Sequence, residues 1–375
     1  MPKTPSFRIA GGSPPRNPIE EVVGRDKFVT QIIACLEHSS VQILAPRRLG
    51  KTWTLHLLNA KKPEMVKASY LDLEKCYSAP DFLFEILNTL NLKKKKLWAK
   101  TEALAQKIVV SGVQLKGNEL AWAGILTEAF KEANDFENIT WLLLDEFPIF
   151  LNNLITKDQP EMATQILDTL RSSRQVYPKI KFVLTGSIGL HWIIDELEKT
   201  GWRNPPNDLE KMFLTTLEPE DGLYLAKGLL NGKGLNINQA EDLARVAEYN
   251  PFYIQKLISC FDLQQNNEPM EDFCDRIAQD AKRDPFELFD LDNRMGRYFG
   301  REDNLAKRIL DLLAEGNALK PKEFVQRLER KPEAVKTILD RLEKDGYIEN
   351  SDGKYLFVSQ ILQRWWSKRR GNLYD

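Results

Sequence analysis

The sequence has little of what a metal-binding or disulfide-bonded protein needs. It contains three histidines and four cysteines in 375 residues, and no two cysteines stand in C-x-x-C spacing. The histidines form no ligand cluster, so neither a zinc site nor a disulfide framework is indicated. The residues concerned are scattered along the chain: Cys35, Cys76, Cys260, Cys274, His38, His56 and His191.

The chain also lacks an excess of charge and lacks long apolar runs. Its 53 basic and 54 acidic residues give a net charge of −1, so any contact with nucleic acid has to come from a local patch. No window approaches the roughly eighteen apolar residues of a membrane-spanning helix. The first residues, Met1-Pro2-Lys3-Thr4-Pro5, lack the apolar core of a signal peptide. We therefore expect a cytoplasmic protein without membrane contact.

What the sequence does contain is enough apolar material for a sizeable core. The chain is 42% hydrophobic and 29% charged, a balance that makes global disorder untenable. A chain of 375 residues is expected to hold two or three domains.

A glycine-lysine-threonine turn is the first motif that carries chemistry. The apolar run 41–44 predicts a short strand, Ala45-Pro46-Arg47-Arg48-Leu49 a turn, and Gly50-Lys51-Thr52 the start of a helix. Free backbone N–H groups at a helix start bind anions. In the G-x-x-x-x-G-K-[ST] pattern the lysine contacts the β- and γ-phosphates and the hydroxyl ligates Mg²⁺. Only the first position departs, where Ala45 replaces glycine; a chance match is the alternative reading.

A second motif makes chance much less plausible. Residues 139–144 form an unbroken apolar run that ends in Asp145-Glu146, which is typical of a strand buried on both faces of a parallel sheet. Ligands bind at the C-terminal end of such strands. Asp145 would hold Mg²⁺ and Glu146 would polarise the attacking water as a general base. An ordinary acidic turn is the alternative, but together the two motifs predict an ATPase.

Strands alternate with helices through the first two thirds of the chain. This order predicts right-handed crossovers and an α/β fold with a parallel sheet. We expect strands at 41–44, 66–73, 139–145, 181–185 and 211–217, and helices at 26–36, 51–59, 160–176 and 190–199, with 80–136 mostly helical. The run Lys93–Lys96 is expected to be a solvated loop.

After Pro219 the pattern becomes helical. Helices are expected at 220–230, 237–247 and 251–263, followed by a linking stretch to about residue 301. The last segment predicts three helices, a hairpin across Asp352-Gly353 and a final helix, the order of a winged helix. The predicted organisation is an extended arm (1–20), a P-loop core (21–218), a helical lid and linker (219–300) and a winged-helix domain (301–375).

Five short motifs together carry a family resemblance. They are Val23-Gly24-Arg25-Asp26, Pro46-Arg47-Arg48-x-Gly50-Lys51-Thr52, Asp145-Glu146, Thr185-Gly186-Ser187 and Asn250-Pro251-Phe252-Tyr253. With the C-terminal winged helix, they resemble the AAA-like and STAND-related P-loop ATPases of bacteria and archaea and, more distantly, origin-recognition initiators. The chain departs from the STAND pattern in having Asn250 before the lid proline and no arginine after Thr185.

The resemblance implies ATP as the nucleotide, together with Mg²⁺; the guanine-reading motif Asn-Lys-x-Asp is absent from the sequence. Gly24 and Arg25 would line the adenine slot, Pro251 would pack on the base, and Ser187 would sense the γ-phosphate. The nucleotide-binding set is Gly24, Arg25, Pro46, Arg47, Arg48, Leu49, Gly50, Lys51, Thr52, Trp53 and Pro251. The catalytic set is Lys51, Glu146, Ser187 and Arg203, and the metal ligands are Thr52 and Asp145.

Several of these residues have plainer readings that the sequence leaves open. Arg203 stands where relatives carry an arginine finger, but a surface arginine fits equally well. Arg47 and Arg48 either contact phosphates or pair with surface acids, and Ser187 is a sensor or a turn residue. Three tryptophans are expected in the core or at a domain interface rather than stacked on bases: Trp202, Trp365 and Trp366.

DNA binding is possible but not favoured by the sequence. The candidate recognition helix, 332–345, mixes acids with bases, and phosphate contacts need unopposed cations. The better patch is the terminal run Arg364, Lys368, Arg369, Arg370.

The leading hypothesis is an ATP-driven molecular switch. ATP held between the sheet and the lid would set the angle of the lid and the winged helix, and the output would be assembly with itself or with a protein partner. The alternatives are an ATP-gated DNA-binding regulator and a scaffold that binds ATP without turnover.

Overall fold

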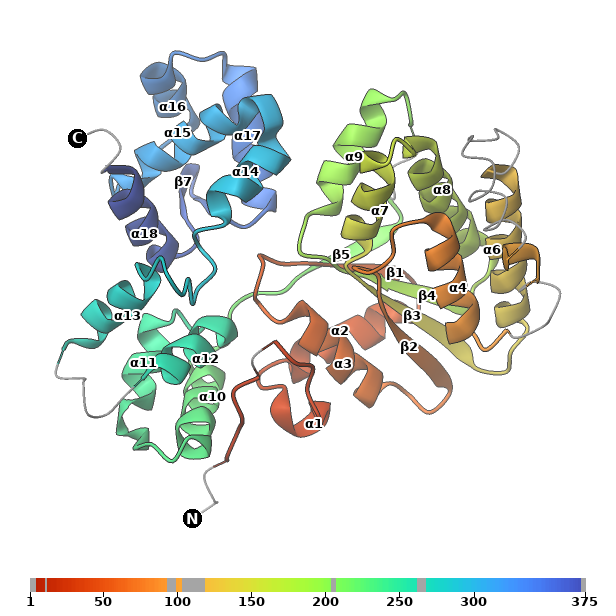
Figure 1. Ribbon diagram of the computed structural model, residues 1–375, viewed down its shortest axis with the longest axis horizontal. Coiled ribbons are helices and arrows are strands. Elements are labelled where there is room, and N and C mark those ends of the chain that lie inside the picture. Colours follow the sequence, from red (N-terminus) through yellow and green to blue (C-terminus); the bar gives the residue numbers. More distant parts are fainter. Residues whose placement is uncertain are drawn as a thin grey trace. The chain divides into compact units, whose positions relative to one another are not determined.

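The computed structural model describes residues 5–10, 12–92, 99–102, 119–203, 207–261 and 268–371. The chain divides into two compact units, which can be followed by colour in Figure 1. The sheet unit comprises Pro14–Leu44 and Lys51–Leu214, and the helical unit comprises Met1–Ser13, Ala45–Gly50 and Thr215–Asp375. The phosphate loop thus groups with the helical unit. The lysine run 93–96 and part of the helical stretch predicted at 80–136 lie outside the described residues.

The sheet unit is built on the parallel sheet that the sequence predicts. Its strands are β1 (Ser40–Leu44), β2 (Val66–Asp72), β3 (Ile139–Asp145), β4 (Ile180–Leu184) and β5 (Leu209–Phe213). They lie in the order β2-β3-β4-β1-β5, and every pairing is parallel. The acidic strand β3 is buried at every position after Ile139, as its unbroken apolar sequence requires. This is the α/β P-loop core, and the prediction of fold class is confirmed.

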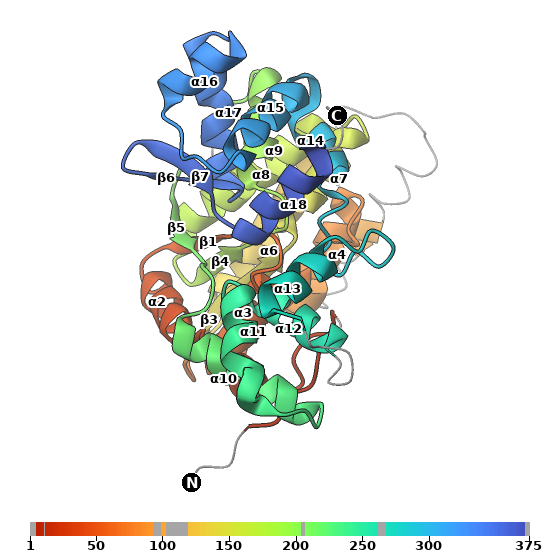
Figure 2. The same cartoon turned by 90° about the vertical axis from the view of Figure 1, so that its left-hand side faces the viewer.

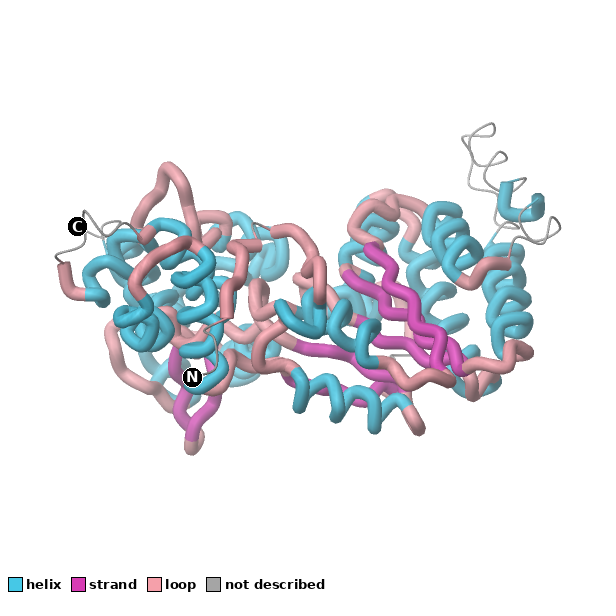
Figure 3. Tube along the Cα trace, turned by 90° about the horizontal axis from the view of Figure 1, so that it is seen from below, coloured by secondary structure: helices cyan, strands magenta, loops and turns pink. Residues whose placement is uncertain are grey.

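Helices cover both faces of the sheet (Figures 1 and 3). One face carries α1 (Pro18–Glu21), α2 (Asp26–Leu36) and α3 (Lys51–Lys61). The other carries α4 (Ala79–Thr89), α6 (Glu119–Asn134), α7 (Phe147–Thr156), α8 (Pro160–Val176) and α9 (Leu190–Lys199). The apolar core lies between this second layer and the sheet, with Phe82, Phe130, Phe150 and Phe182 at most 1% exposed. No helix among the described residues is long and apolar enough to cross a membrane.

Three details of the prediction for this region were wrong. Helix α7 was not expected, because its first residues, 147–151, form a continuous apolar run in which no amphipathic period can be seen. Its buried residues Phe147, Phe150, Leu151 and Leu154 nevertheless follow helical spacing. Strand β5 begins two residues earlier than expected and ends at Phe213, because it follows β1 from Ser40 to Leu44. The N-terminal arm is not extended throughout, since its end forms α1.

The helical unit begins with three helices, α10 (Pro219–Gly232), α11 (Ala240–Val246) and α12 (Pro251–Cys260), with a 3₁₀ turn at Ile237–Gln239. The N-terminal arm lies along α10: Phe7 N donates to Gly228 O at 2.8 Å, and Asn231 Nδ2 donates to Pro5 O at 2.9 Å. The stretch predicted as a linker contains two further helices, α13 (Met270–Ala278) and α14 (Leu291–Phe299), which corrects that expectation.

A winged helix closes the chain, as the sequence predicts. It consists of α15 (Asp303–Ala314), α16 (Pro321–Leu328), α17 (Pro332–Lys344), the hairpin β6 (Ile348–Ser351) and β7 (Lys354–Phe357), and α18 (Gln360–Gly371). Figure 2 shows the hairpin beside these helices. Asp352 and Gly353 both have positive φ, 51° and 77°, which is the conformation of a two-residue hairpin turn. The domain boundaries predicted after residues 20, 218 and 300 stay predictions.

Candidate active site

The predicted phosphate loop connects β1 to α3, as its sequence requires. Gly50 has φ +90°, a conformation that favours glycine, and α3 starts at the next residue, Lys51. Lys51 and Leu49 are buried, at 7% and 4% exposure. The first backbone N–H groups of α3 have no carbonyl partner within their own helix, so this turn has the form of an anion site. Trp53 is half-buried on the first turn of α3.

The two predicted metal ligands meet in the sheet unit. Thr52 Oγ1 donates to Asp145 Oδ2 at 2.7 Å. The same carboxylate oxygen accepts the hydroxyl of Tyr70 at 3.0 Å, and Asp145 Oδ1 accepts Glu146 N at 3.1 Å. Burial raises the pKa of the Asp145 carboxyl, and the hydrogen bonds from Thr52 and Tyr70 oppose that rise. The first turn of α3 and the end of β3 therefore bring a hydroxyl and a carboxylate together, although they are far apart in sequence.

This donor set fits Mg²⁺. The described residues contain no group of three His, Cys, Asp or Glu that could form an all-protein metal cage. Mg²⁺ does not need one, because it binds through one or two carboxylates, keeps several waters and takes further oxygens from substrate phosphates. Thr52 and Asp145 offer only oxygen ligands, which suits this hard cation and not zinc.

Glu146 adopts an unusual backbone conformation directly after the acidic strand. Its φ of 53° and ψ of 29° are left-handed, and it caps α7. Its Oε2 accepts both Ser187 N, at 2.7 Å, and Ser187 Oγ, at 2.9 Å. Burial raises the pKa of Glu146, and the hydrogen bonds from Ser187 partly offset this. A carboxylate with a raised pKa, held beside the predicted metal ligands, suits the role of general base.

Ser187 reaches Glu146 because the residue before it is glycine. A Cβ at Gly186 would lie 2.6 Å from Pro148 Cδ, so only glycine allows the β4–α9 turn to pack this closely on α7. The Thr185 hydroxyl in the same turn is buried and has no hydrogen-bond partner in the described structure. Buried polar atoms without partners are rare in folded proteins, and this one lies two residues from the Ser187–Glu146 contact. No local sequence pattern singles out the Thr185 side chain.

The arginines of the phosphate loop have different environments. Arg47 is exposed. Arg48, with φ 71°, donates from Nε to Glu287 Oε2 at 2.8 Å and makes a bidentate ion pair with that carboxylate. Its guanidinium also lies 5.0 Å from the centre of the Phe252 ring. All three residues belong to the helical unit, so Arg48 contacts α12 and an acid there, and its contact with phosphate stays a prediction.

The other predicted nucleotide contacts lie at helix starts. Gly24 has φ +69°, and buried Arg25 precedes α2. Pro251 opens α12, where the Asn250 side chain accepts the N–H groups of Phe252 and Tyr253. The asparagine that departs from the family pattern is therefore a helix cap. Arg203 is exposed between α9 and β5. Their roles towards a nucleotide stay predictions.

The C-terminal basic run is largely engaged within the helical unit. Arg364 Nε and Lys368 Nζ both donate to Asp275, at 2.8 and 3.1 Å, and the Arg369 guanidinium lies 5.0 Å from the centre of the Phe289 ring. The side chain of Arg370 lies outside the described residues. The three tryptophans predicted in the core or at an interface are buried or half-buried. Trp365 and Trp366 are 1% exposed, and Trp202 packs against the sheet-unit core and donates from Nε1 to Asp168 Oδ1 at 3.2 Å.

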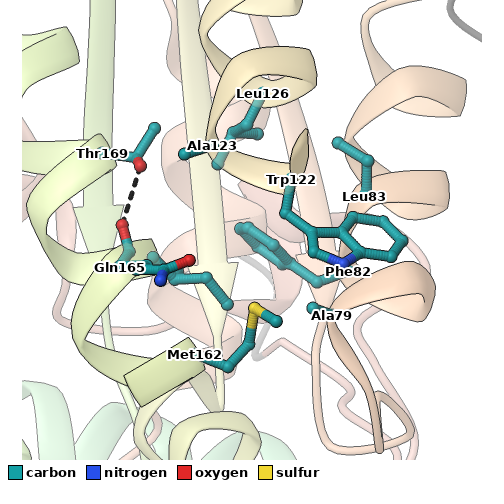
Figure 4. Close-up of a pocket in the computed structure, with 10 residues that line it drawn as sticks. Ala79, Phe82, Leu83, Trp122, Ala123, Leu126, Met162, Gln165 and Thr169 are labelled. Atoms are coloured by element: carbon teal, nitrogen blue, oxygen red, sulfur yellow. Dashed lines mark hydrogen bonds between the residues drawn. The ribbon is translucent and has the colours of Figure 1, made fainter. Parts of the chain in front are cut away.

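A separate apolar cleft lies between α4, α6 and α8 (Figure 4). The indole of Trp122 and the side chain of Met162 point into it. Its lining residues are Ala79, Phe82, Leu83, Trp122, Ala123, Leu126, Met162, Gln165, Ile166 and Thr169. None of these lining residues is titratable.

Known proteins share the fold of this chain. No protein-family model and no curated protein matches it. Among solved structures, the Walker-type ATPase of Pyrococcus abyssi aligns with a TM-score of 0.62 at 15% identity, over 96% of this chain and 99% of that one. The ORC2 protein of Aeropyrum pernix, in its ADPNP–ADP complexes, aligns with a TM-score of 0.52 at 12% identity, over 98% of this chain and 99% of that one. The chain therefore shares the fold of these two proteins, an α/β P-loop core with a helical region and a C-terminal winged helix, and the resemblance is confirmed at the level of fold.

Proposed function

We propose that this protein, which has the AAA-like P-loop ATPase fold, binds ATP with Mg²⁺, hydrolyses it slowly and acts as a molecular switch. The nucleotide state would set the position of the lid and winged helix, and the output would be assembly with itself or with a protein partner. The observation that carries the ATPase proposal is the convergence of Thr52, Asp145, Glu146 and Ser187 at the C-terminal edge of the sheet.

The chemistry follows from these residues. Backbone N–H groups at the start of α3 and the Lys51 ammonium hold the phosphates. Thr52 and Asp145 would hold Mg²⁺, which would supply positive charge to neutralise the nucleotide phosphates. Glu146 accepts a proton from the attacking water as the water oxygen bonds to the γ-phosphorus, while the bond from that phosphorus to the bridging oxygen breaks and ADP leaves. Ser187 donates twice to Glu146, which holds that carboxylate in place beside the predicted metal ligands.

The switch proposal is supported by contacts of the phosphate loop. Residues 45–50 group with the helical unit, and Arg48 joins Glu287 and Phe252 there. Pro46 packs under Gly346, between α17 and β6 of the winged helix, so closely that a Cβ at Gly346 would lie 2.2 Å from Pro46 Cγ. A nucleotide phosphate that displaces these loop residues would therefore act directly on the lid and the winged helix.

Two substitutions test the ATPase proposal. Lys51→Ala is expected to abolish ATP binding, and Glu146→Gln is expected to bind ATP and retain it without release of phosphate. Glu248→Gln is the matched control, because Glu248 is also a partly buried acid with a raised pKa, and it accepts Ile361 N at 2.7 Å in the helical unit. Binding is measured with radiolabelled ATP on filters, and turnover as phosphate release. Full turnover by Glu146→Gln would exclude Glu146 as the base.

The switch itself is tested by its nucleotide response. Saturating ATP is expected to change the protease cleavage pattern of residues 215–371 in the Glu146→Gln variant. If the output is self-assembly, the same variant should elute as a larger species in size-exclusion chromatography. If the output is a protein partner, the ATP-bound variant should retain that partner in a pull-down. Identical cleavage and size with ATP, with ADP and without nucleotide would leave a scaffold that binds ATP. The arginine-finger role of Arg203 is part of this proposal, and it predicts that Arg203→Ala lowers turnover only where the protein self-associates.

A further inference from the structure

Tyr70 occupies a position that the sequence did not connect with the site. It lies on β2, whose register with β3 pairs Tyr70 with Leu143 and Asp72 with Asp145. Tyr70 and Asp72 are two residues apart on one strand, so their side chains project from the same face of the sheet. From there the Tyr70 hydroxyl reaches Asp145 Oδ2 at 3.0 Å.

The tyrosine ring is fixed by a second contact. The His56 ring lies 4.5 Å from the Tyr70 ring, centre to centre, with the planes tilted by 32°. His56 follows Thr52 by four residues on α3, so the two side chains share one face of that helix. Thr52 therefore contacts Asp145 directly, and His56 contacts the tyrosine that holds Asp145. Burial and the negative charge of Asp145 both raise the pKa of Tyr70, which keeps the phenol protonated as a hydrogen-bond donor.

We propose that Tyr70 is a positioning residue, which fixes the Asp145 carboxylate for Mg²⁺ through its hydrogen bond to Oδ2. This inference rests on the proposed ATPase function and deepens it. The terminal torsion of an aspartate is broad, so packing alone does not orient the carboxylate. Thr52 and Tyr70 both donate to Oδ2, and Glu146 N donates to Oδ1, so the three hydrogen bonds define the plane of the carboxylate.

The two donors to Oδ2 have different roles. The Thr52 hydroxyl is itself a predicted metal ligand, so its oxygen would bind the cation while its O–H group donates to Asp145. The Tyr70 hydroxyl is not a predicted metal ligand and acts only as a hydrogen-bond donor to Asp145. Removal of partners that orient metal ligands typically costs about 10-fold to 100-fold in metal affinity. We therefore expect the loss of the Tyr70 hydroxyl to weaken Mg²⁺ binding and to leave metal-independent contacts with the nucleotide intact.

The test is Tyr70→Phe, which removes the hydroxyl and keeps the ring against His56. Equilibrium binding of a fluorescent ATP analogue to the full chain is followed by fluorescence anisotropy, first in EDTA and then across a Mg²⁺ titration. We expect unchanged affinity in EDTA and a rise of about tenfold or more in the Mg²⁺ concentration that gives half of the full enhancement. At saturating Mg²⁺, the kcat for ATP is expected to stay within about twofold of wild type, because the ligands themselves are intact.

Tyr77→Phe is the matched control, because Tyr77 is 55% exposed in the same unit and lies beside Lys157, away from Asp145. It should match the wild type throughout. A Tyr70→Phe titration that superimposes on wild type overturns the inference and leaves the ATPase proposal intact. A lowered melting temperature with the same Mg²⁺ dependence also overturns it, since that result assigns Tyr70 a structural role only. If the wild type itself binds no nucleotide at any Mg²⁺ concentration, both proposals fail.

Discussion

The contact between the phosphate loop and the winged helix can be tested with two glycines that share a backbone conformation. Gly346 has φ +74° and Gly353 has φ +77°. A Cβ at Gly346 would lie 2.2 Å from Pro46 Cγ and 3.0 Å from Pro46 Cδ, whereas a Cβ at Gly353 meets nothing within 4 Å. The paired substitutions Gly346→Ala and Gly353→Ala therefore differ in their effect on Pro46 and hardly at all in backbone strain.

The expected magnitudes follow from this geometry. An alanine in the left-handed region costs about 1–2 kcal/mol, and both variants carry that cost. Gly346→Ala additionally forces the Pro46 ring aside, an overpacking that costs about 1–3 kcal/mol more. The free energy of unfolding should fall by about 1 kcal/mol or somewhat more in Gly353→Ala, and by about 2–5 kcal/mol in Gly346→Ala.

The assay is urea denaturation of both variants followed by tryptophan fluorescence, together with ATP binding. Since Pro46 lies four residues before Gly50 in the phosphate loop, Gly346→Ala is also expected to weaken ATP binding, while Gly353→Ala should leave it unchanged. Equal destabilisation by the two alanines would refute the reasoning, because it would mean that Gly346 does not pack on Pro46. Unequal stability with unchanged ATP affinity would separate the packing contact from the proposed switch.

Three further outcomes are expected. Gly232→Ala places a Cβ 1.9 Å from a main-chain oxygen of the N-terminal arm, so the free energy of unfolding should fall by about 1–3 kcal/mol. Gly124→Ala, at an open helix position, should raise the free energy of unfolding by about 0.5–1 kcal/mol. Urea denaturation measures both. Ser187→Ala should lower kcat by about tenfold with little change in the KM for ATP, since it removes a hydrogen bond to the charged base; an unchanged kcat would make Ser187 a turn residue only. Duplex DNA should leave turnover unchanged, because Lys368 is paired with Asp275; a gel shift that weakens with salt and with Lys368→Gln would contradict this.

Much of the sheet unit could be predicted from local patterns. The apolar run before Asp145 identified β3, since a strand buried on both faces has an unbroken apolar sequence. The Gly50-Lys51-Thr52 turn identified the start of α3 because the phosphate-binding pattern is local. Helix α7 was missed for the opposite reason: residues 147–151 are all apolar, and this run hides the alternation by which an amphipathic helix is recognised.

The site was only partly predictable. Thr52, Asp145, Glu146 and Ser187 were identified by motif, but the hydrogen bonds of Glu146 to Ser187 depend on the left-handed turn at Glu146 and on the close packing of the β4–α9 turn against α7. Arg48 was assigned to phosphates or to a surface acid, and the acid proved to be Glu287, which lies in a stretch taken for a linker.

The fold class, the glycine-lysine-threonine turn and the acidic strand can be inferred from the sequence alone, because each of these depends on the order and polarity of neighbouring residues. The contact of Tyr70 with Asp145 and the packing of Pro46 against Gly346 are visible only in the folded structure. Such contacts join residues far apart in the chain, and they are set by strand register and helix packing. No local pattern of polarity encodes a distance of that kind.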